Sequence, residues 1–209
     1  ATSSVGRGLA SGVGAVLADR DGSVWISTEA SLDRFRNGHW TIYSSRREPS
    51  FDPRSPPPAQ TATDESITLK GFPDSAGGSL LQDSRGRLWL GTYSSGLGYL
   101  DGERFVRLAG VPAGPIDSIV EDSEGSIWIA HRDAGLIRIS PGGEVRSMPW
   151  ASIGSSGPAR RLAPDPLRRG LWLGFESGGV VHFVDGRVSA AYATGDGLVK
   201  GRVNALYAD

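Results

Sequence analysis

Cysteine is absent from this chain of 209 residues, and histidine is scarce. Without cysteine there are no disulfide bonds, zinc–thiolate sites or thiol nucleophiles. The three histidines, His39, His131 and His182, are widely separated and form no H-x-x-H or H-E-x-x-H arrangement. We therefore expect no metal site and no cofactor.

Sequence motifs of the common enzyme classes are missing as well. The chain has no G-x-S-x-G nucleophile elbow, no G-x-x-x-x-G-K-[ST] phosphate loop and no dinucleotide-binding fingerprint. The segment DRDG from Asp19 has some likeness to a calcium loop, but other parts of the sequence carry plain turns at the equivalent place. No catalytic residue is therefore predicted.

Charge and hydropathy limit the classes of partner. Lysine and arginine number 22 against 23 acidic residues, a net charge of −1, and like charges never run beyond adjacent pairs. This balance predicts no nucleic-acid partner. No apolar stretch approaches the roughly 18 residues that span a bilayer, so membrane contact is expected only through segments outside this sequence. The chain begins with Ala1 instead of methionine, which favours a mature exported protein or an excised domain.

The chain is rich instead in one repeated phrase. Each copy has an aspartate, a polar turn containing glycine, and a tryptophan between aliphatic residues. The copies are DRDGSVWIST from Asp19, DSRGRLWLGT from Asp83, DSEGSIWIAH from Asp122 and DPLRRGLWLGF from Asp165. Their tryptophans follow one another at intervals of 64, 39 and 44 residues and are Trp25, Trp89, Trp128 and Trp172. Recurrence near one period indicates a supersecondary unit that has been copied.

The second copy shows this unit most clearly. Apolar runs at residues 79–82 and 88–90 flank a turn at 83–87, and further runs follow at 97–100 and 105–108. Short runs separated by turns containing Asp and Gly predict strands joined by hairpins. Each repeat is therefore predicted to be a four-stranded antiparallel meander, with strands A to D in chain order.

Strand B is apolar on both faces in all four copies, as in Leu88-Trp89-Leu90. A strand with one wet face would alternate, so these strands belong to sheets that are covered on both sides. Blades packed face to face in a β-propeller meet this requirement, whereas a β-sandwich needs no such recurrence. We predict an all-β propeller in which strand A lines the central axis and the four repeated tryptophans are buried between blades. Trp40 and Trp150 are expected outside this core.

The repeats divide the chain into blades. The predicted bounds are about 11–44 for blade 1, 77–109 for blade 2, 115–150 for blade 3, 159–194 for blade 4 and 198–209 for the first strand of a fifth blade. An insertion at about 45–70, which contains the proline-rich run from Ser55 to Pro58, separates blades 1 and 2. Strand D of blade 1 is either His39–Tyr43 or Ser66–Lys70, and the likeness of RNGHWTIY to DGERFVRL favours the former. The chain is expected to be an open part of a larger ring, and its uncovered faces are expected to bind the remaining blades or a second copy of the chain.

The repeats resemble those of the two-component regulator propeller family. The likeness is carried by IVEDSEGSIWIAHRDAGLIRI, LLQDSRGRLWLGTYSSGLGYLDGERF and GDGLVKGRVNALYAD, and it extends over nearly the whole chain. Ala130-His131 and Gly174-Phe175 stand where the family pattern has Gly-Thr, and the fourth copy has one extra residue before its tryptophan. The resemblance implies a seven-bladed ring on the periplasmic or extracellular side of a bacterial inner membrane, ahead of a membrane helix and a histidine kinase or another output domain. It also implies the sensing of oligosaccharides.

Ligand-binding residues are expected where the copies differ. The loops between strands B and C differ most, and in a meander they emerge on the same face as the loops that join one blade to the next. We therefore predict a rim site for a polar ligand, such as an oligosaccharide, formed by Glu29, Tyr93, His131, Arg132 and Glu176. Two alternatives stay open: a protein-interaction scaffold, and a propeller lyase or hydrolase that uses Glu29, His131 and Glu176 as acid and base.

Overall fold

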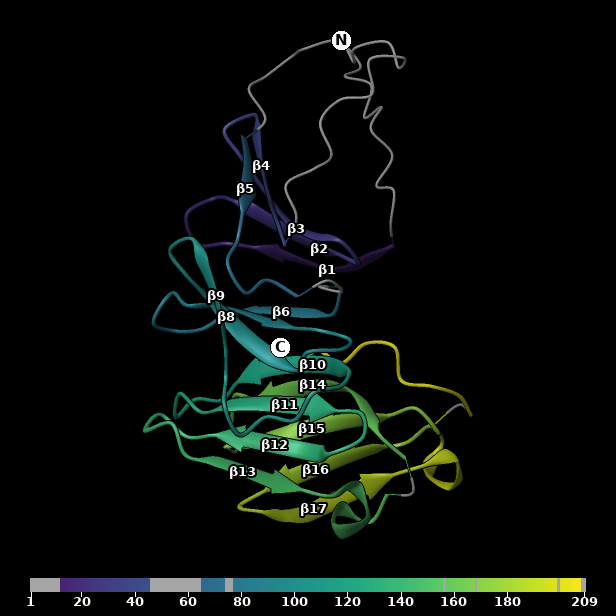
Figure 1. The fold of residues 1–209 in the computed structure, drawn as a ribbon. Coiled ribbons are helices and arrows are strands. Elements are labelled where there is room, and N and C mark those ends of the chain that lie inside the picture. The colour runs from purple at the N-terminus through teal and green to yellow at the C-terminus, as the bar shows by residue number, and fades with distance from the viewer. Residues whose placement is uncertain are drawn as a thin grey trace, which may run out of the picture.

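The computed structural model describes residues 12–45, 65–73, 77–155, 157–167, 169–198 and 200–207. Within these ranges the chain forms four sheets, each with its strands in chain order, and two short 3₁₀ helices. Figure 1 shows the sheets following one another from β1–β5 at one end of the molecule to β14–β17 at the other. The prediction of an all-β fold with four-stranded blades is confirmed.

The strands of the four blades have the following bounds. Blade 1 contains β1 (Val13–Ala18), β2 (Val24–Thr28), β3 (Ser31–Arg36) and β4 (His39–Ser44). Blade 2 contains β6 (Ser79–Gln82), β7 (Leu88–Gly91), β8 (Leu97–Asp101) and β9 (Arg104–Arg107). Blade 3 contains β10 (Ile116–Glu121), β11 (Ile127–His131), β12 (Gly135–Ile139) and β13 (Val145–Met148). Blade 4 contains β14 (Ala159–Asp165), β15 (Gly170–Phe175), β16 (Val180–Val184) and β17 (Arg187–Tyr192).

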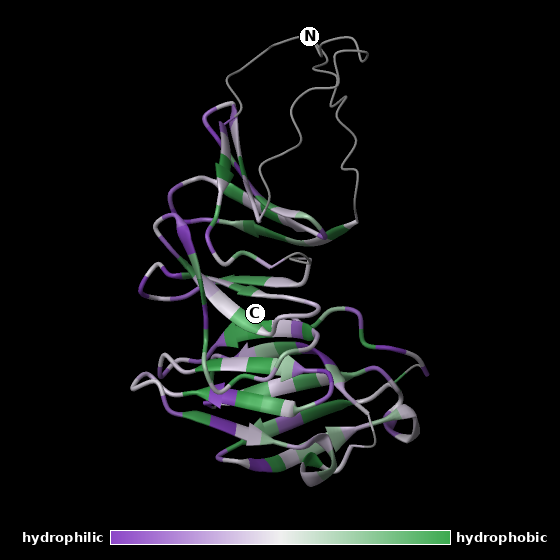
Figure 2. Cartoon of the chain, in the orientation of Figure 1, coloured by the Kyte–Doolittle hydropathy of each residue, from purple (hydrophilic) through white to green (hydrophobic). Residues whose placement is uncertain are grey.

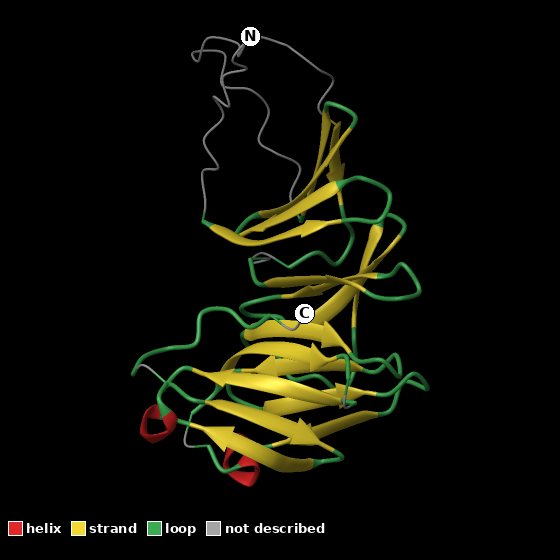
Figure 3. Cartoon of the chain, turned by 180° about the vertical axis from the view of Figure 1, so that it is seen from behind, coloured by secondary structure: helices red, strands yellow, loops and turns green. Residues whose placement is uncertain are grey.

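Two 3₁₀ helices, the short coils in Figure 3, complete the described secondary structure. They are η1 (Trp150–Ile153), which follows β13, and η2 (Thr194–Asp196), which follows β17. Neither is long enough to cross a bilayer, and the described residues contain no other helix.

A fifth strand extends blade 1. β4 is antiparallel to β3 and holds the strand D position that the sequence comparison favoured, and β5 (Glu65–Thr68) pairs in parallel with β4. Residues 65–68 therefore belong to the sheet and not to the insertion that we predicted at about 45–70. The proline-rich run at 55–58 lies outside the described residues. Beyond β5, Leu69 and Phe72 are buried in the contact between blades 1 and 2, so this part of the chain contributes to the core.

Successive blades pack through three hydrophobic clusters. In each cluster the repeated tryptophan of one blade packs with strand B aliphatics of the next: Trp25 with Leu88 and Leu90, Trp89 with Ile127 and Ile129, and Trp128 with Leu171 and Leu173. These three tryptophans are buried, as predicted. The inner strands β1, β6, β10 and β14 contact one another in that order, which places strand A of each blade on the same side of the arc. Figure 2 shows hydrophobic residues along the strands and hydrophilic ones at many of the turns.

Two tryptophans depart from the prediction. Trp172 is only partly buried, because no described residues form a further blade against its face of blade 4. Trp150, expected outside the core, is 8% exposed and belongs to the cluster between blades 3 and 4. Its indole Nε1 donates to the carbonyl oxygens of His131 and Arg132, both at 3.1 Å. Helix η1 therefore inserts an aromatic ring between two blades, which the repeat pattern did not reveal.

The spacing of aspartate and tryptophan in the repeat has a hydrogen-bonding reason. In blades 1 to 3 the indole Nε1 donates to Oδ2 of the aspartate: Trp25 to Asp19 at 2.9 Å, Trp89 to Asp83 at 2.9 Å and Trp128 to Asp122 at 2.7 Å. The other carboxylate oxygen accepts N–H groups of the turn, for example from Arg85 and Arg87 in blade 2. One carboxylate thus closes the A–B turn and satisfies a polar group of the buried indole.

Residues 202–207 form no strand, although we predicted the first strand of a fifth blade there. Their first backbone hydrogen bond to the preceding blade nevertheless resembles the one at the start of strand A in blade 3. The Val203 N–H donates to the Phe175 carbonyl oxygen at 3.2 Å, as the Ile116 N–H donates to Thr92 at 3.0 Å. Gly174 leaves room for Val203, since a Cβ there would lie 2.5 Å from its side chain. The segment holds the place of a following strand A, but no described residue pairs with it as a strand.

Candidate functional site

Strand A begins with a β-bulge in blades 1, 3 and 4. The register shifts at Gly14, Asp117 and Arg160, which occupy equivalent positions ahead of the repeated aspartate. A bulge turns a side chain out of the regular alternation of a strand, and bulges are frequent next to functional sites. Glycine occupies this position in blade 1, whereas blades 3 and 4 place charged side chains there.

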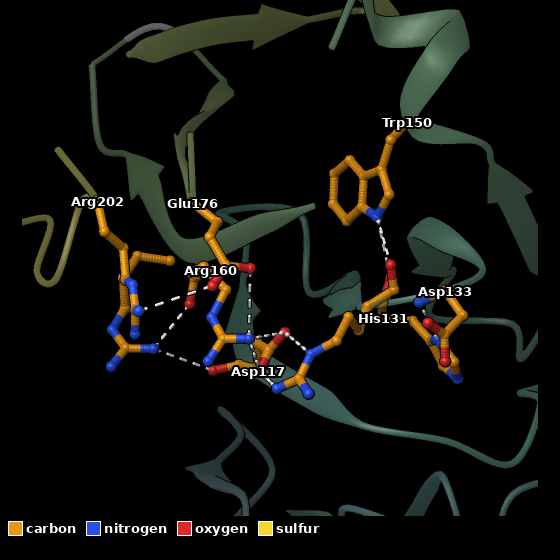
Figure 4. A network of polar contacts seen from close by, with 9 residues as sticks. Asp117, His131, Asp133, Trp150, Arg160, Glu176 and Arg202 are labelled. Atoms are coloured by element: carbon orange, nitrogen blue, oxygen red, sulfur yellow. Dashed lines mark hydrogen bonds and ion pairs between the residues drawn. The ribbon is translucent and has the colours of Figure 1, made fainter. Parts of the chain in front are cut away.

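Asp117 is the centre of an ion-pair network, shown in Figure 4. Arg132, from the loop after β11, donates from Nη2 to Oδ1 at 2.8 Å and from Nε to Oδ2 at 3.3 Å. Arg160, from the bulge of β14, places Nη1 at 3.2 Å from both carboxylate oxygens. The Asp117 side chain is only 4% exposed, and two guanidinium groups compensate for the loss of its hydration. Asp117 therefore joins blade 3 to blade 4.

Glu176 extends this network along the rim. Its carboxylate, in the loop after β15, lies 3.9 Å from Arg160 Nη1 and 3.7 Å from Arg202 Nη2. Both distances are too long for hydrogen bonds, so the contacts are loose ion pairs. The side chains of Glu176 and Arg202 are 42% and 53% exposed. We call Asp117, Arg132, Arg160, Glu176 and Arg202 the rim network.

Asp117 also has the largest effect on the pKa of Arg132. The hydrogen bond to Asp117 raises the pKa of the Arg132 guanidinium, and this effect outweighs the lowering of the pKa by burial. The charges of Asp117, Glu176 and Asp133 raise it further. Arg132 is therefore a permanent cation whose side chain is fixed by its neighbour.

A groove of about 360 Å³ adjoins the rim network. Its lining includes Val180, Leu198, Lys200, Arg202, Val203 and Leu206. Arg161 fixes one wall, because its Nε donates to the Asn204 carbonyl oxygen at 2.8 Å and its Nη1 to that of Arg160 at 2.7 Å. The groove thus places apolar surface and two cations beside the rim network, a combination suited to a polar ligand.

The five residues predicted for the rim site fall into three groups. Arg132 and Glu176 both join the rim network, linked through Asp117 and Arg160. Glu29 and Tyr93 are exposed in the corresponding loops of blades 1 and 2, and among the described residues neither contacts this network. His131 forms the third group, because it is buried.

His131 closes a turn instead of facing a ligand. It is 1% exposed, and its Nδ1 accepts the N–H groups of Asp133 and Ala134 at 3.2 and 3.1 Å. Thr28 and Thr92 hold the equivalent positions in blades 1 and 2, where their hydroxyls accept N–H groups of the same turn. His131 therefore lies beneath the exposed surface of the rim, and the prediction that it binds a ligand stays a prediction. The histidine replaces threonine as the acceptor that closes the B–C turn.

Asp117, Arg160 and Arg202 were missed by sequence reasoning. A signal for two of them was present, since Asp117 and Arg160 stand where blades 1 and 2 have Gly14 and Gly78. The five predicted site residues all lie in or next to the loops after strand B. Strand A contributes side chains to the rim only because of its bulges and because neighbouring blades bring these side chains together. The sequence of a single repeat shows neither feature.

A second polar cluster lies on the open face of blade 4. Ser189 Oγ is 2.8 Å from His182 Nδ1, and His182 Nε2 is 2.8 Å from Asp165 Oδ2. These side chains and Trp172 line a groove of about 570 Å³. The composition is that of a hydrolase triad, but Ser189 Oγ also lies 3.2 Å from the His182 carbonyl oxygen, so the hydroxyl is engaged within its own sheet. No group of three or more metal-binding side chains occurs among the described residues.

Two of the repeats match a known family profile, that of the two component regulator propeller, at residues 72–94 and 110–133. These segments include the A–B turns and tryptophan strands of blades 2 and 3. These two segments are two-component regulator propeller repeats. The sequence-based resemblance is thus confirmed. Comparison with curated proteins found no match.

Solved structures share the fold of this repeat protein. The extracellular domain described as that of hybrid two component system BT3049 from B. thetaiotaomicron matches with a TM-score of 0.68 and 20% identity, over 94% of this chain and 24% of that one. A streptogramin B lyase matches with a TM-score of 0.57 and 15% identity, over 88% of this chain and 55% of the other. PorZ, a surface component of the type-IX secretion system of Porphyromonas gingivalis, matches with a TM-score of 0.53 and 13% identity, over 91% of this chain and 28% of PorZ. The chain therefore spans about a quarter of the length of the two-component relative, and these likenesses establish a β-propeller fold.

Proposed function

We propose that this propeller is the extracytoplasmic ligand-sensing region of a two-component signalling protein, and that its rim binds a polar ligand such as an oligosaccharide. The observation that carries this proposal is the rim network. Its charged groups come from the positions at which the repeats differ, whereas the repeated positions serve turns and packing. The family of the repeats and the extracellular two-component neighbours support the location and the sensory role.

The chemistry of the rim suits recognition of hydroxylated molecules. Guanidinium groups donate several hydrogen bonds in a fixed plane, and the exposed guanidinium of Arg202 can donate them to hydroxyl oxygens of a ligand. The groove beside Arg202 offers apolar surface for the rest of the ligand. Glu29 and Tyr93 would contribute only to a ligand long enough to reach blades 1 and 2.

We further propose that this region binds without catalysis. A streptogramin B lyase shares the fold, so the fold alone is neutral on this question. His131, one of the three residues considered as acid or base, is committed to a turn. Polysaccharides and oligosaccharides incubated for long periods with the chain should therefore be recovered intact, and accumulation of unsaturated or hydrolysed products would contradict this part of the proposal.

The proposal is tested by a binding screen with matched variants. Soluble oligosaccharides are screened by isothermal titration calorimetry against the wild-type chain and against Arg202→Gln, which changes an exposed member of the rim network. Arg146→Gln, on the outer strand β13, is the control because Arg146 pairs only with the neighbouring Glu144 among described contacts. Binding that Arg202→Gln weakens and Arg146→Gln leaves unchanged supports the rim site. A glycan that binds all three proteins equally overturns it.

A protein-interaction scaffold is the second candidate. The groove on blade 4, with the exposed Tyr192 and Tyr207, is a surface that a protein segment could cover. A structural neighbour, YCF48 bound to the D1 peptide, shows that a propeller of similar fold binds a peptide. Under this alternative Leu167→Glu, which adds a charge beside the groove, weakens partner binding, whereas Arg202→Gln has no effect.

A further inference from the structure

The rim carries more positive than negative side chains. The network and the adjoining groove contain the cations Arg132, Arg160, Lys200 and Arg202, and Arg161 lies beside them through its hydrogen bond to Asn204. The carboxylates nearby are those of Asp117, Asp133 and Glu176. The whole chain, by contrast, has a net charge of −1. Positive charge is therefore concentrated at this rim, and such a concentration favours anionic ligands.

The carboxylates of this rim differ in how firmly they are held. Asp117 is buried and receives three hydrogen bonds from Arg132 and Arg160, so both of its oxygens are committed to the protein. Glu176 is exposed, and its ion pairs with Arg160 and Arg202 are longer than hydrogen bonds. Asp117 is a fixed part of the site, whereas Glu176 can move away with little loss of interaction energy.

Glu176 lies where a carboxylate of a ligand could bind. Its carboxylate lies within 4 Å of both Arg160 Nη1 and Arg202 Nη2 (Figure 4). Arg202 also lines the groove, together with Lys200. A carboxylate brought by a ligand could form short, charge-assisted hydrogen bonds with the same two guanidinium groups. The ligand's remaining atoms would then lie in the groove of about 360 Å³.

We propose that the rim selects acidic oligosaccharides, whose carboxylate displaces Glu176 and binds between Arg160 and Arg202. This inference rests on the proposed sensing function and names the class of its ligand. Glu176 acts as an internal competitor in the unliganded protein. Arg161 is a positioning residue, because it fixes the backbone at Asn204 close to Arg202.

The test uses pairs of ligands that differ only in charge. Carboxylated oligosaccharides, namely trigalacturonate, oligoalginate and an aldobiouronic acid, are each compared with their methyl esters by isothermal titration calorimetry. We expect the free acid of at least one pair to bind about tenfold or more tightly than its ester, since a hydrogen-bonded ion pair is lost on esterification. The affinity of that acid should fall as salt is raised, because the network is partly exposed.

Two variants should shift this affinity in opposite directions. Arg202→Gln removes one of the two cations, and we expect it to weaken binding of the acid about tenfold and binding of the ester by a smaller factor, because the ester keeps only the neutral hydrogen bonds. Glu176→Gln removes the internal competitor, and we expect it to strengthen binding of the acid about twofold to fivefold. Both side chains are exposed, so both variants should fold, and Arg146→Gln serves as the unchanged control.

The outcomes separate this inference from the function on which it rests. Esters that bind as tightly as acids overturn the acidic preference and leave glycan sensing standing. Glu176→Gln that weakens binding of the acid overturns the displacement of Glu176. If no member of the panel binds while a neutral glycan from the screen does, the acidic class is wrong. If no glycan of either kind binds, both proposals are wrong.

Discussion

Blades 1 to 3 and blade 4 use the same repeat in different ways. In the first three, the aspartate of the A–B turn accepts a hydrogen bond from a buried tryptophan, as Asp83 does from Trp89 at 2.9 Å. In blade 4 one extra residue separates Asp165 from Trp172, and Asp165 pairs instead with His182 Nε2 at 2.8 Å. Trp172 stacks on the His182 ring with centroids 4.4 Å apart and stays partly exposed. With this inserted residue, an imidazole lies beside the turn aspartate in the place that the indole holds in the other blades.

The residue of strand C that pairs with the repeated tryptophan also differs in blade 4. His182 stands opposite Trp172, where Arg34 stands opposite Trp25 and Arg138 opposite Trp128. Both arginines lie over the indole rings, 5.3 and 5.4 Å from the centroids, and the cation covers the aromatic face. A repeated tryptophan therefore does not by itself define a core position. Its role depends on the turn length, on the residue across the strand and on the blade that covers it.

The largest expected difference between these regions is in stability. Trp89→Ala should lower the free energy of unfolding by about 3–5 kcal/mol, because the indole is 4% exposed and packs between two blades. Trp172→Ala should cost only about 1–2 kcal/mol, since its ring is partly exposed. Urea unfolding followed by circular dichroism measures both. Equal losses at the two sites would contradict the distinction drawn between the blades.

A smaller effect should appear as coupling between aspartate and tryptophan. In a double-mutant cycle with Asp83→Ala and Trp89→Phe, we expect a coupling free energy of about 1 kcal/mol from the lost indole hydrogen bond. The matched cycle with Asp165→Ala and Trp172→Phe should give a value near zero, because Asp165 pairs with His182. Coupling of similar size in both cycles would show that the extra residue in blade 4 has no energetic consequence.

The uncovered face of blade 4 should produce weak association. Leu167 and Tyr192 are 85% and 46% exposed around the groove of about 570 Å³, and exposed apolar surface of this kind favours contact with a further blade or a second copy of the chain. We expect the sedimentation coefficient to rise with protein concentration in analytical ultracentrifugation. Leu167→Glu should reduce this rise, while Arg107→Glu on the outer strand β9 should not. A monomer at all concentrations would show that this face needs no cover.

The smallest effect concerns the turn of blade 1 and its response to pH. Hydrogen bonds from Ser23, together with the charges of Arg34 and Arg36, lower the pKa of Asp21 from 3.8 to about 2. A lowered pKa stabilises the fold above the ordinary pKa, and the contribution disappears as the pH falls through about 2. Asp21 should therefore have no effect on the pH dependence of stability between pH 5 and 8. Carboxyl NMR titration should give a midpoint near 2, and Ser23→Ala should raise it towards 3.8.

The sequence by itself determined the repeating architecture. Apolar residues on both faces of strand B require cover on both sides, and a copied meander supplies that cover by stacking. The same reasoning located the loops after β11 and β15 as variable, and with them Arg132 and Glu176. It also predicted burial for Trp25, Trp89 and Trp128, because their aliphatic neighbours share one pattern.

Only the tertiary structure decided how these parts act together. Asp117 and Arg160 are 43 residues apart in sequence, and they meet because bulges at the starts of β10 and β14 direct their side chains to one rim. Histidine is a residue type that is common in binding sites. In this structure, however, His131 Nδ1 accepts hydrogen bonds from two N–H groups of its own turn and so stabilises that turn. The sequence shows which residues of each repeat are charged or apolar. Which charges pair and which side chains are buried depends on which blades lie side by side. That arrangement makes a network of the charged residues and leaves Trp172 partly exposed.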